Sequence, residues 1–250
     1  MAAYWTALCA GITAVTVFLV FRVKKKLLQA AMTKAVASLL FILTALAASY
    51  VTLSRIAAEN GIDGSFGEAL RYACFICGGL VCGLLGDIWL DLKYCYREDD
   101  RPLTYAGFIS FAAGHVFYTA ALISLYGLPL LNALISVGIA AAVALVIYFG
   151  EKVMKLMYGE FKPISALYGF VMFTMMLFAQ SFCIFRNGAP LPVCALVMTV
   201  GGIFFIISDF ILSGTYFGVG RDRSGDIIAN HVTYYTAQFI IASSVLFIRL

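Results

Sequence analysis

Long runs of apolar residues constrain this chain more than any other feature of its sequence. A helix needs about 20 consecutive apolar residues to cross the hydrocarbon core of a bilayer. Eight such runs can be cut from the 250 residues, at 3–23, 31–53, 69–92, 104–125, 130–148, 163–185, 190–213 and 228–248. Apolar residues make up 63% of the chain, and its mean hydropathy is +0.97. These values exclude an ordinary soluble globular protein.

The connections between the runs are too short to hold a soluble domain. We therefore predict an all-α, polytopic membrane protein with eight transmembrane helices, in one transmembrane domain over residues 1–250. The first run is not expected to be a cleaved signal peptide, because its basic cluster, Lys24 to Lys26, follows the apolar residues instead of preceding them.

Basic residues predict the orientation, because Lys and Arg are retained on the cytoplasmic side of a membrane. Lys34 is set aside as intramembrane. Twelve of the other sixteen basic residues follow or flank the ends of the first, third, fifth and seventh runs: Arg22, Lys24, Lys25, Lys26, Lys93, Arg97, Arg101, Lys152, Lys155, Lys162, Arg221 and Arg223. The opposite side has Arg55, Arg71, Arg186 and Arg249. We expect both termini to be non-cytoplasmic.

The two halves of the chain, about 1–125 and 126–250, place similar polar residues in the same order. Three pairs match: Lys34 with Lys162, Asp87 with Asp209, and His115 with His231. The members of each pair lie in equivalent runs, which indicates a parallel internal repeat of four helices plus four.

Two aspartates within the apolar runs, Asp87 and Asp209, are candidates for a functional site, because an ionisable group in hydrocarbon is costly. An alternative for Asp87 is a structural ion pair with Lys34. Lys34 could instead extend its side chain to the headgroups. Asp91, one turn after Asp87, is expected to reach the cytoplasmic interface.

Other polar residues fall at a similar depth in the predicted helices. Lys34, Asp87, Asp209, Tyr168, Tyr234 and Gln238 all lie in the cytoplasmic half, and His115 lies deeper. His231, Tyr234 or Tyr235, and Gln238 share one helix face, as do His115 and Tyr118. We expect a polar pocket that opens toward the cytoplasmic leaflet. His115 could instead be an interhelical hydrogen-bond donor, and His231 and the two tyrosines could be interface residues.

Four short motifs resemble those of one family over essentially the whole chain. They are GLLGDIWL with Asp87, GHVFYTAAL with His115 and Tyr118, IISDFIL with Ser208 and Asp209, and YYTAQFII with Tyr234, Tyr235 and Gln238. In these motifs the chain resembles the lysoplasmalogenase (YhhN-like) membrane proteins. Members usually carry Lys-Pro near the start of the second helix. This chain has Lys34-Ala35 there and places Lys-Pro at Lys162-Pro163.

The resemblance implies hydrolysis of the vinyl ether bond of a lysoplasmalogen, which gives a fatty aldehyde and glycerophosphoethanolamine or glycerophosphocholine. Two carboxyl groups suit this reaction, since one can protonate the substrate while the other stabilises the resulting cation. Asp87 is expected to be the acid and Asp209 its partner, or the reverse. The expected supporting residues are Lys34, His115, Tyr118, Ser208, Tyr234, Tyr235 and Gln238. No cofactor or metal is expected. The expected partners are a lysophospholipid substrate and membrane lipids; a homodimer stays open, and nothing points to nucleic acid.

Two other functions remain open from the sequence. A transporter could use the same buried polar cluster, although transporter sites are often built on helices broken near the midplane, and all five prolines here lie at predicted helix ends. A membrane zinc hydrolase would have His115 and His231 as its only histidine ligands, which excludes a three-histidine site. Sensitivity to a chelator separates this last function from carboxylate chemistry.

Overall fold

The computed structural model describes residues 1–186, 188–218 and 223–249, and its regular elements are helices. The one other pairing within these residues is an isolated bridge between Leu156 and Gly218. The longer helices are α1 (Ala2–Val23), α2 (Leu27–Asn60), α3 (Gly64–Cys95), α4 (Asp100–Tyr126), α5 (Leu130–Phe149), α7 (Lys162–Ile184), α8 (Val193–Phe217) and α9 (Ser224–Ser243). A short helix, α6 (Glu151–Met154), and 3₁₀ turns at Arg97–Asp99, Gly159–Phe161 and Ser244–Phe247 complete the described elements. The predicted all-α class is confirmed.

Among the described residues, seven helices are long and apolar enough to cross a membrane: α1, α2, α3, α4, α5, α7 and α8. The chain is therefore a multi-pass membrane protein. The eighth predicted span, 228–248, corresponds to α9 and the 3₁₀ turn that follows it, but α9 is not among the seven.

Capping residues set the ends of several helices and carry them past the predicted spans. The side chain of Asp63 accepts hydrogen bonds from the backbone N–H groups of Ser65 and Phe66, at 2.9 and 3.2 Å, and so starts α3. Gly61 and Gly127 follow α2 and α4 with positive φ angles of 79° and 74°, which glycine adopts without strain. Helix α2 ends later than predicted and α3 starts earlier, because these caps and not the apolar residues set the two ends.

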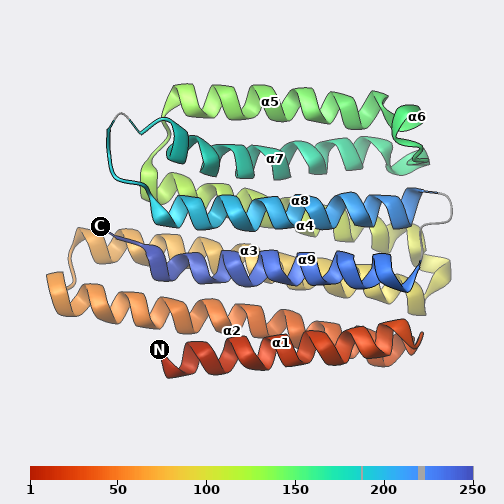
Figure 1. Ribbon diagram of the computed structural model, residues 1–250, viewed down its shortest axis with the longest axis horizontal. Helices are drawn as coiled ribbons and strands as arrows, with labels where there is room; N and C mark the ends of the chain where they lie inside the picture. The colour runs from red at the N-terminus through yellow and green to blue at the C-terminus, as the bar shows by residue number, and fades with distance from the viewer. Residues whose placement is uncertain (187, 219–222, 250) are drawn as a thin grey trace.

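The helices form one bundle in which each half of the chain packs in sequence order, with consecutive helices of a half running antiparallel (Figure 1). Helices α1 to α4 pack as consecutive neighbours, and so do α5, α7, α8 and α9. Contacts of α4 with α7 and of α9 with α2 join the halves, so that α2, α3, α4, α7, α8 and α9 form a closed ring. Helix α1 packs on α2 and α9, and α5 packs on α7, both outside this ring.

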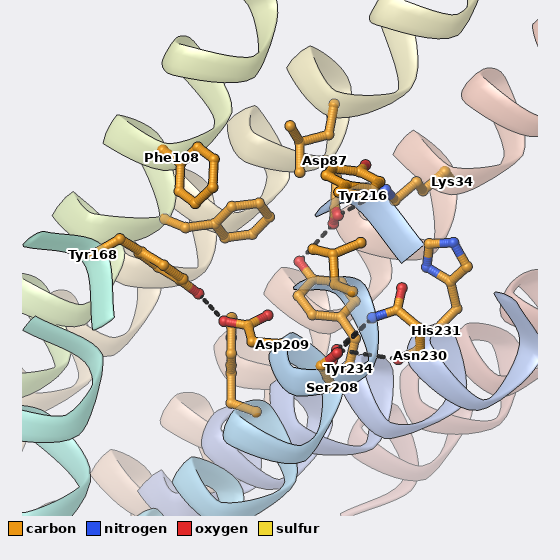
Figure 2. Close-up of a pocket in the computed structure, with 14 residues that line it drawn as sticks. Lys34, Asp87, Phe108, Tyr168, Ser208, Asp209, Tyr216, Asn230, His231 and Tyr234 are labelled. Carbon is orange, nitrogen blue, oxygen red and sulfur yellow. Dashed lines mark hydrogen bonds and ion pairs between the residues drawn. The ribbon is translucent and has the colours of Figure 1, made fainter. Parts of the chain in front are cut away.

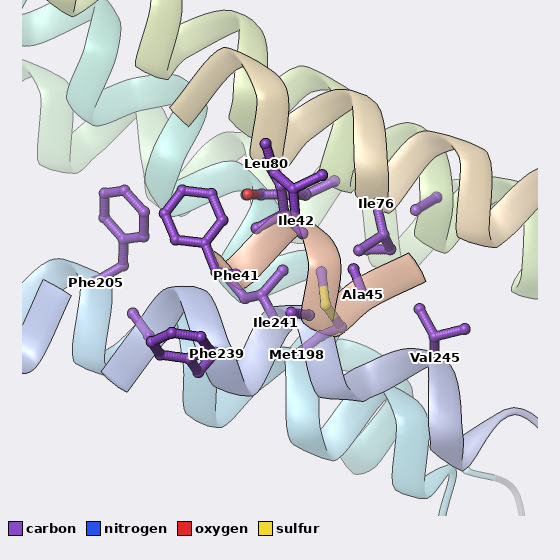
Figure 3. Packing of buried hydrophobic residues seen from close by; sticks show 14 of the residues in the cluster. Phe41, Ile42, Ala45, Ile76, Leu80, Met198, Phe205, Phe239, Ile241 and Val245 are labelled. Atoms are coloured by element: carbon purple, nitrogen blue, oxygen red, sulfur yellow. The ribbon is translucent and has the colours of Figure 1, made fainter. Parts of the chain in front are cut away.

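The apolar core lies inside the ring and borders the polar residues that follow, since Phe205 belongs to both. Figure 3 shows its packing between α2, α3, α8 and α9, with the side chains of Phe41, Ala45, Ile76, Leu80, Met198, Phe205 and Ile241. Glycines on α3 let neighbouring side chains approach its backbone. A Cβ atom at Gly83 would lie 2.7 Å from Nε2 of Gln238, and one at Gly86 would lie 2.6 Å from the ring of Phe111. The glycine face of α3 thus admits polar and aromatic groups next to Asp87.

Candidate active site

Asp87 is buried at the centre of an ion pair and two hydrogen bonds. Its side chain is 2% exposed, and its Oδ1 lies 3.2 Å from Nζ of Lys34 on α2. Its Oδ2 accepts hydrogen bonds from the hydroxyl groups of Ser38, at 2.6 Å, and Tyr234, at 2.7 Å. Both oxygens therefore have partners that favour the ionised carboxylate.

Asp91 belongs to the same buried cluster. Nζ of Lys34 donates to Oδ1 of Asp91 at 3.0 Å, and the guanidinium of Arg22 lies 4.0 Å from Oδ2. The expectation that Asp91 lies at the depth of the cytoplasmic interface stays a prediction, and its side chain is buried in the protein, at 3% exposed. Lys34 is 5% exposed, so it does not extend to the headgroups; it is held between two carboxylates.

A chain of hydrogen bonds supports Asp87 from α4 and α9. The hydroxyl of Tyr118 donates to Oε1 of Gln238, and Nε2 of Gln238 donates to the hydroxyl oxygen of Tyr234, each at 3.0 Å. The hydroxyl group of Tyr235 lies 3.2 Å from Oγ of Ser38 and donates to the backbone oxygen of Lys34 at 3.2 Å. Four of the residues expected to support the reaction, Tyr118, Tyr234, Tyr235 and Gln238, thus gather around Asp87, but only Tyr234 is among the residues that line the pocket beside it.

Asp209, on α8, has a different environment. The hydroxyl group of Tyr168, on α7, donates to Oδ2 of Asp209, and no ion pair to Asp209 is found among the described residues. Figure 2 shows Tyr168 directed toward Asp209 from α7, while the hydroxyl group of Tyr234 is directed toward Asp87. Ser208, the residue before, is turned to α9, where it exchanges hydrogen bonds with Asn230 at 2.8 to 3.1 Å.

Asp87 and Asp209 line the same central pocket, which is drawn in Figure 2. Its polar lining comes from Lys34, Asp87, Tyr168, Ser208, Asp209, Tyr216, Asn230, His231 and Tyr234, and its apolar lining from Leu90, Phe108, Phe111, Phe205 and Leu212. The water-accessible volume is about 50 Å³, enough for a few water molecules. Both aspartates therefore border the same space.

Two larger spaces adjoin the central pocket. The first, which we call the vestibule, has a volume of about 810 Å³ and includes Arg22, Lys25, Asp91, Lys93 and Asp100 in its lining. It shares Leu212, Tyr216, Asn230 and His231 with the central pocket. The second, the apolar groove, has a volume of about 380 Å³ and runs between α5, α7 and α8. It shares Phe108, Tyr168, Asp209, Leu212 and Tyr216 with the central pocket.

The two histidines lie apart from one another. His115 is 1% exposed and packs against the ring of Phe205, with ring centroids 4.6 Å apart; neither of its ring nitrogens has a hydrogen-bond partner among the described residues. It is not among the residues that line the central pocket, whereas His231 is. No group of three or more His, Cys, Asp or Glu side chains in the described ranges has the spacing to hold a metal ion.

Four polar residues of the site, Ser38, Asp91, Tyr216 and Asn230, were not among the predicted ones. Ser38 and Asp91 lie one turn after Lys34 and Asp87 on the same helix faces, so the i, i+4 spacing could have identified them. Asn230 precedes His231, and no predicted site residue lies one turn before it. Tyr168 was predicted to lie at the right depth, but its contact with Asp209 depends on the packing of α7 against α8, which the sequence does not reveal.

The model of the YhhN family matches residues 29–245, which include the site from Lys34 to Gln238. Neither the curated proteins nor the solved structures include a significant match. The family match covers most of the chain and agrees with the resemblance seen in its motifs. The chain belongs to the YhhN family.

Proposed function

We propose that this protein hydrolyses the vinyl ether bond of lysoplasmalogens and releases a fatty aldehyde and a glycerophosphodiester. One observation carries the proposal: two carboxyl groups line one pocket, and only one of them has a cationic partner among the described residues. Acid-catalysed cleavage of a vinyl ether needs one group that donates a proton and one that stays negative near the cation. Membership of the YhhN family supports the same activity.

The surroundings favour Asp209 as the acid and Asp87 as the stabilising carboxylate, the second of the two assignments left open by the sequence. Asp87 has Lys34 and two hydroxyl donors, which hold it ionised. Asp209 accepts one hydrogen bond at Oδ2, from Tyr168, which leaves Oδ1 free to carry a proton toward the substrate. Pairs of carboxyl groups with different environments divide acid and base roles in this way.

The reaction follows from these roles. Asp209 donates its proton to the outer carbon of the vinyl ether, and the carbon bonded to oxygen becomes an oxocarbenium ion, which the carboxylate of Asp87 stabilises. Water adds to that carbon, and the proton it releases returns to the carboxyl pair. The resulting hemiacetal breaks its bond to the glycerol oxygen, which takes the hemiacetal hydroxyl proton. The products are an aldehyde and a free glycerol hydroxyl group.

The three connected spaces match the parts of a single-chain lipid. The apolar groove suits an alkenyl chain, with a lining that includes Ile147, Met172 and Phe173, and it reaches Asp209. The charged vestibule suits a polar headgroup. The central pocket lies between them, where the vinyl ether joins the chain to the glycerol. This arrangement supports a lysolipid as the substrate.

We also propose that α9 is the eighth membrane-crossing helix and that the bundle is a parallel repeat of four plus four. Helix α9 packs against α1, α2, α3 and α8, and its polar residues face the pocket, which accounts for its lower hydropathy. The two ends of the chain lie at the same end of the bundle (Figure 1). The packing order α1 to α4 recurs in α5, α7, α8 and α9. One domain holds both halves.

From the distribution of the basic residues, we expect the vestibule to lie on the cytoplasmic side of the membrane and both termini to lie on the other side. Of the residues that support this orientation, Arg221 and the side chain of Arg97 lie outside the part that the structure describes.

The test is aldehyde release by the purified protein in detergent from an alkenyl lysophospholipid, beside its saturated alkyl-ether analogue and with a chelator. We expect aldehyde from the alkenyl lipid alone, with or without chelator. Loss of aldehyde on chelation would indicate metal chemistry. No aldehyde from folded protein would contradict the proposal and favour transport.

A further inference from the structure

The vestibule is lined by three cations, and the ion pairs that two of them make with described carboxylates are long. Arg22 lies 4.0 Å from Oδ2 of Asp91, beyond hydrogen-bond distance. Lys93, whose side chain is 12% exposed, lies 3.7 Å from Asp100, whose side chain is 61% exposed, so water screens this pair on the Asp100 side. Lys25 adds a third cation to the lining.

Aromatic rings hold the two main cations in place without cancelling their charge. The guanidinium carbon of Arg22 lies 3.7 Å from the ring centroid of Tyr94, and Nζ of Lys93 lies 3.6 Å from that of Tyr216. Both distances are well within the range of cation–π contacts. Such contacts orient a cation and leave its donors available to an anion.

The positions of the two tyrosines link these cations to the proposed catalytic residues. Tyr94 follows Asp87 by seven residues on α3, and Tyr216 follows Asp209 by seven residues on α8. Each tyrosine therefore lies about two helical turns closer to the vestibule than its aspartate. Tyr216 lines the vestibule, the central pocket and the apolar groove, so all three spaces meet beside it.

We infer that Arg22 and Lys93 form a binding site for the phosphodiester of a lysophospholipid headgroup. The inference rests on the proposed function for its substrate class. In such a lipid only the glycerol carbons separate the ether oxygen from the phosphate. An ether placed in the central pocket therefore sets the phosphate in the adjoining vestibule. Arg and Lys together supply the charge-assisted hydrogen bonds that a phosphate accepts.

The site is tested by binding, which needs no turnover. The two ligands are a saturated 1-alkyl-glycerophosphoethanolamine, which has no vinyl ether to cleave, and the matching 1-alkylglycerol, which lacks the phosphate. Their affinities are measured for wild-type protein in detergent, for the double variant Arg22→Gln/Lys93→Gln, and for Lys24→Gln. Lys24 is exposed in the same α1–α2 turn and is not part of the vestibule lining, which makes it the matched control.

We expect wild-type protein and Lys24→Gln to bind the phospholipid at least about tenfold more tightly than the alkylglycerol, the value of one good charge-assisted contact. The double variant should lose this preference while its affinity for the alkylglycerol stays the same. Equal affinities in wild-type protein, or a preference that survives in the double variant, would overturn the inference. The wild-type comparison remains decisive even if the double variant does not fold.

Two competition measurements distinguish a headgroup site from a site for free phosphate. Glycerophosphoethanolamine should displace the bound phospholipid more effectively than inorganic phosphate does. Displacement by inorganic phosphate alone would overturn the headgroup assignment in favour of a free-phosphate site. Because binding is measured on uncleavable ligands, a missing headgroup preference contradicts this inference only, whereas missing aldehyde contradicts the proposed function only.

Discussion

Asp87 and Asp209 occupy matching places in the two halves of the bundle but have different surroundings. Each lies eight residues before the last residue of its helix, α3 or α8. Asp87 has an ammonium group and two hydroxyl groups as partners, whereas Asp209 has the hydroxyl group of Tyr168 as its one described hydrogen-bond donor. Similar positions have thus acquired different charge environments.

The two aspartates differ in their charge environments because the two halves of the chain place a lysine differently. Lys34 lies seven residues inside α2 and reaches Asp87. In the other half, Lys162 is the first residue of α7 and pairs with Glu151 at 3.3 Å, at the end of the bundle. Two halves with the same packing order therefore supply two carboxyl groups at one depth, and the placement of a lysine decides which of them is paired.

The largest effect is expected from Asp209→Asn, because it removes the proposed proton donor. The rate of aldehyde release should fall by about 10²–10⁴-fold, the usual contribution of a general acid. The melting temperature should change little, because an asparagine can still accept the hydrogen bond from Tyr168. Asp99→Asn, at an exposed carboxyl group, is the control and should keep wild-type activity. A stable Asp209→Asn protein with normal turnover would remove Asp209 from the mechanism.

Lys34→Met should mainly affect stability. It leaves Asp87 and Asp91 close together without their shared cation, and breaking a buried ion pair costs about 3–5 kcal/mol. The measurement is the free energy of unfolding in detergent. In Lys34→Met/Asp87→Asn, part of this loss should be recovered, since one unpaired charge is removed. If the double variant recovers none of the lost free energy of unfolding, Lys34 and Asp87 are not energetically coupled.

Removing one hydroxyl donor from each aspartate should have effects of different size on catalysis. Tyr168→Phe removes the one described hydrogen bond to Asp209, whereas Tyr234→Phe leaves Ser38 and Lys34 on Asp87. We expect Tyr168→Phe to lower kcat by about tenfold, because this hydrogen bond stabilises the carboxylate that Asp209 becomes as it gives up its proton, and to change the pH profile of kcat/KM. Tyr234→Phe should have the smaller effect on both. A larger effect of Tyr234→Phe than of Tyr168→Phe would favour Asp87 as the acid.

The sequence predicted the helical scaffold and the position of both aspartates within apolar helices, because these depend on local patterns. Apolar runs of bilayer length predicted the helices, and an ionisable residue within such a run marks a candidate site without any knowledge of packing. The helix ends were less predictable, because caps such as Asp63 extend α3 beyond its apolar residues. The pairing of Lys34 with Asp87 was present among the alternatives that the sequence left open.

The contacts between distant helices could not be predicted in the same way. Tyr168 meets Asp209 because α7 packs on α8, and His115 packs against Phe205 and is not among the residues that line the central pocket. A helical repeat of 3.6 residues identifies which residues share a face, but it does not state which helix that face will meet. The burial of Asp91 has the same cause, since Lys34 comes from α2.

The smallest effect is expected at the second lysine. The backbone N–H of Tyr158, at 2.6 Å, and the ammonium of Lys162 lower the pKa of Glu151 below its ordinary value of 4.5. A carboxyl group with a lowered pKa in the folded state contributes stability above its ordinary pKa and loses it as the pH falls through the folded value. At pH 7, Lys162→Met should change the melting temperature only slightly, because the pair lies at a partly exposed position. Glu151→Gln should reduce the loss of stability seen below pH 4.5. A loss for Lys162→Met as large as that for Lys34→Met would mean that depth in the bundle does not separate the two lysines, and the contrast between the two halves would fail.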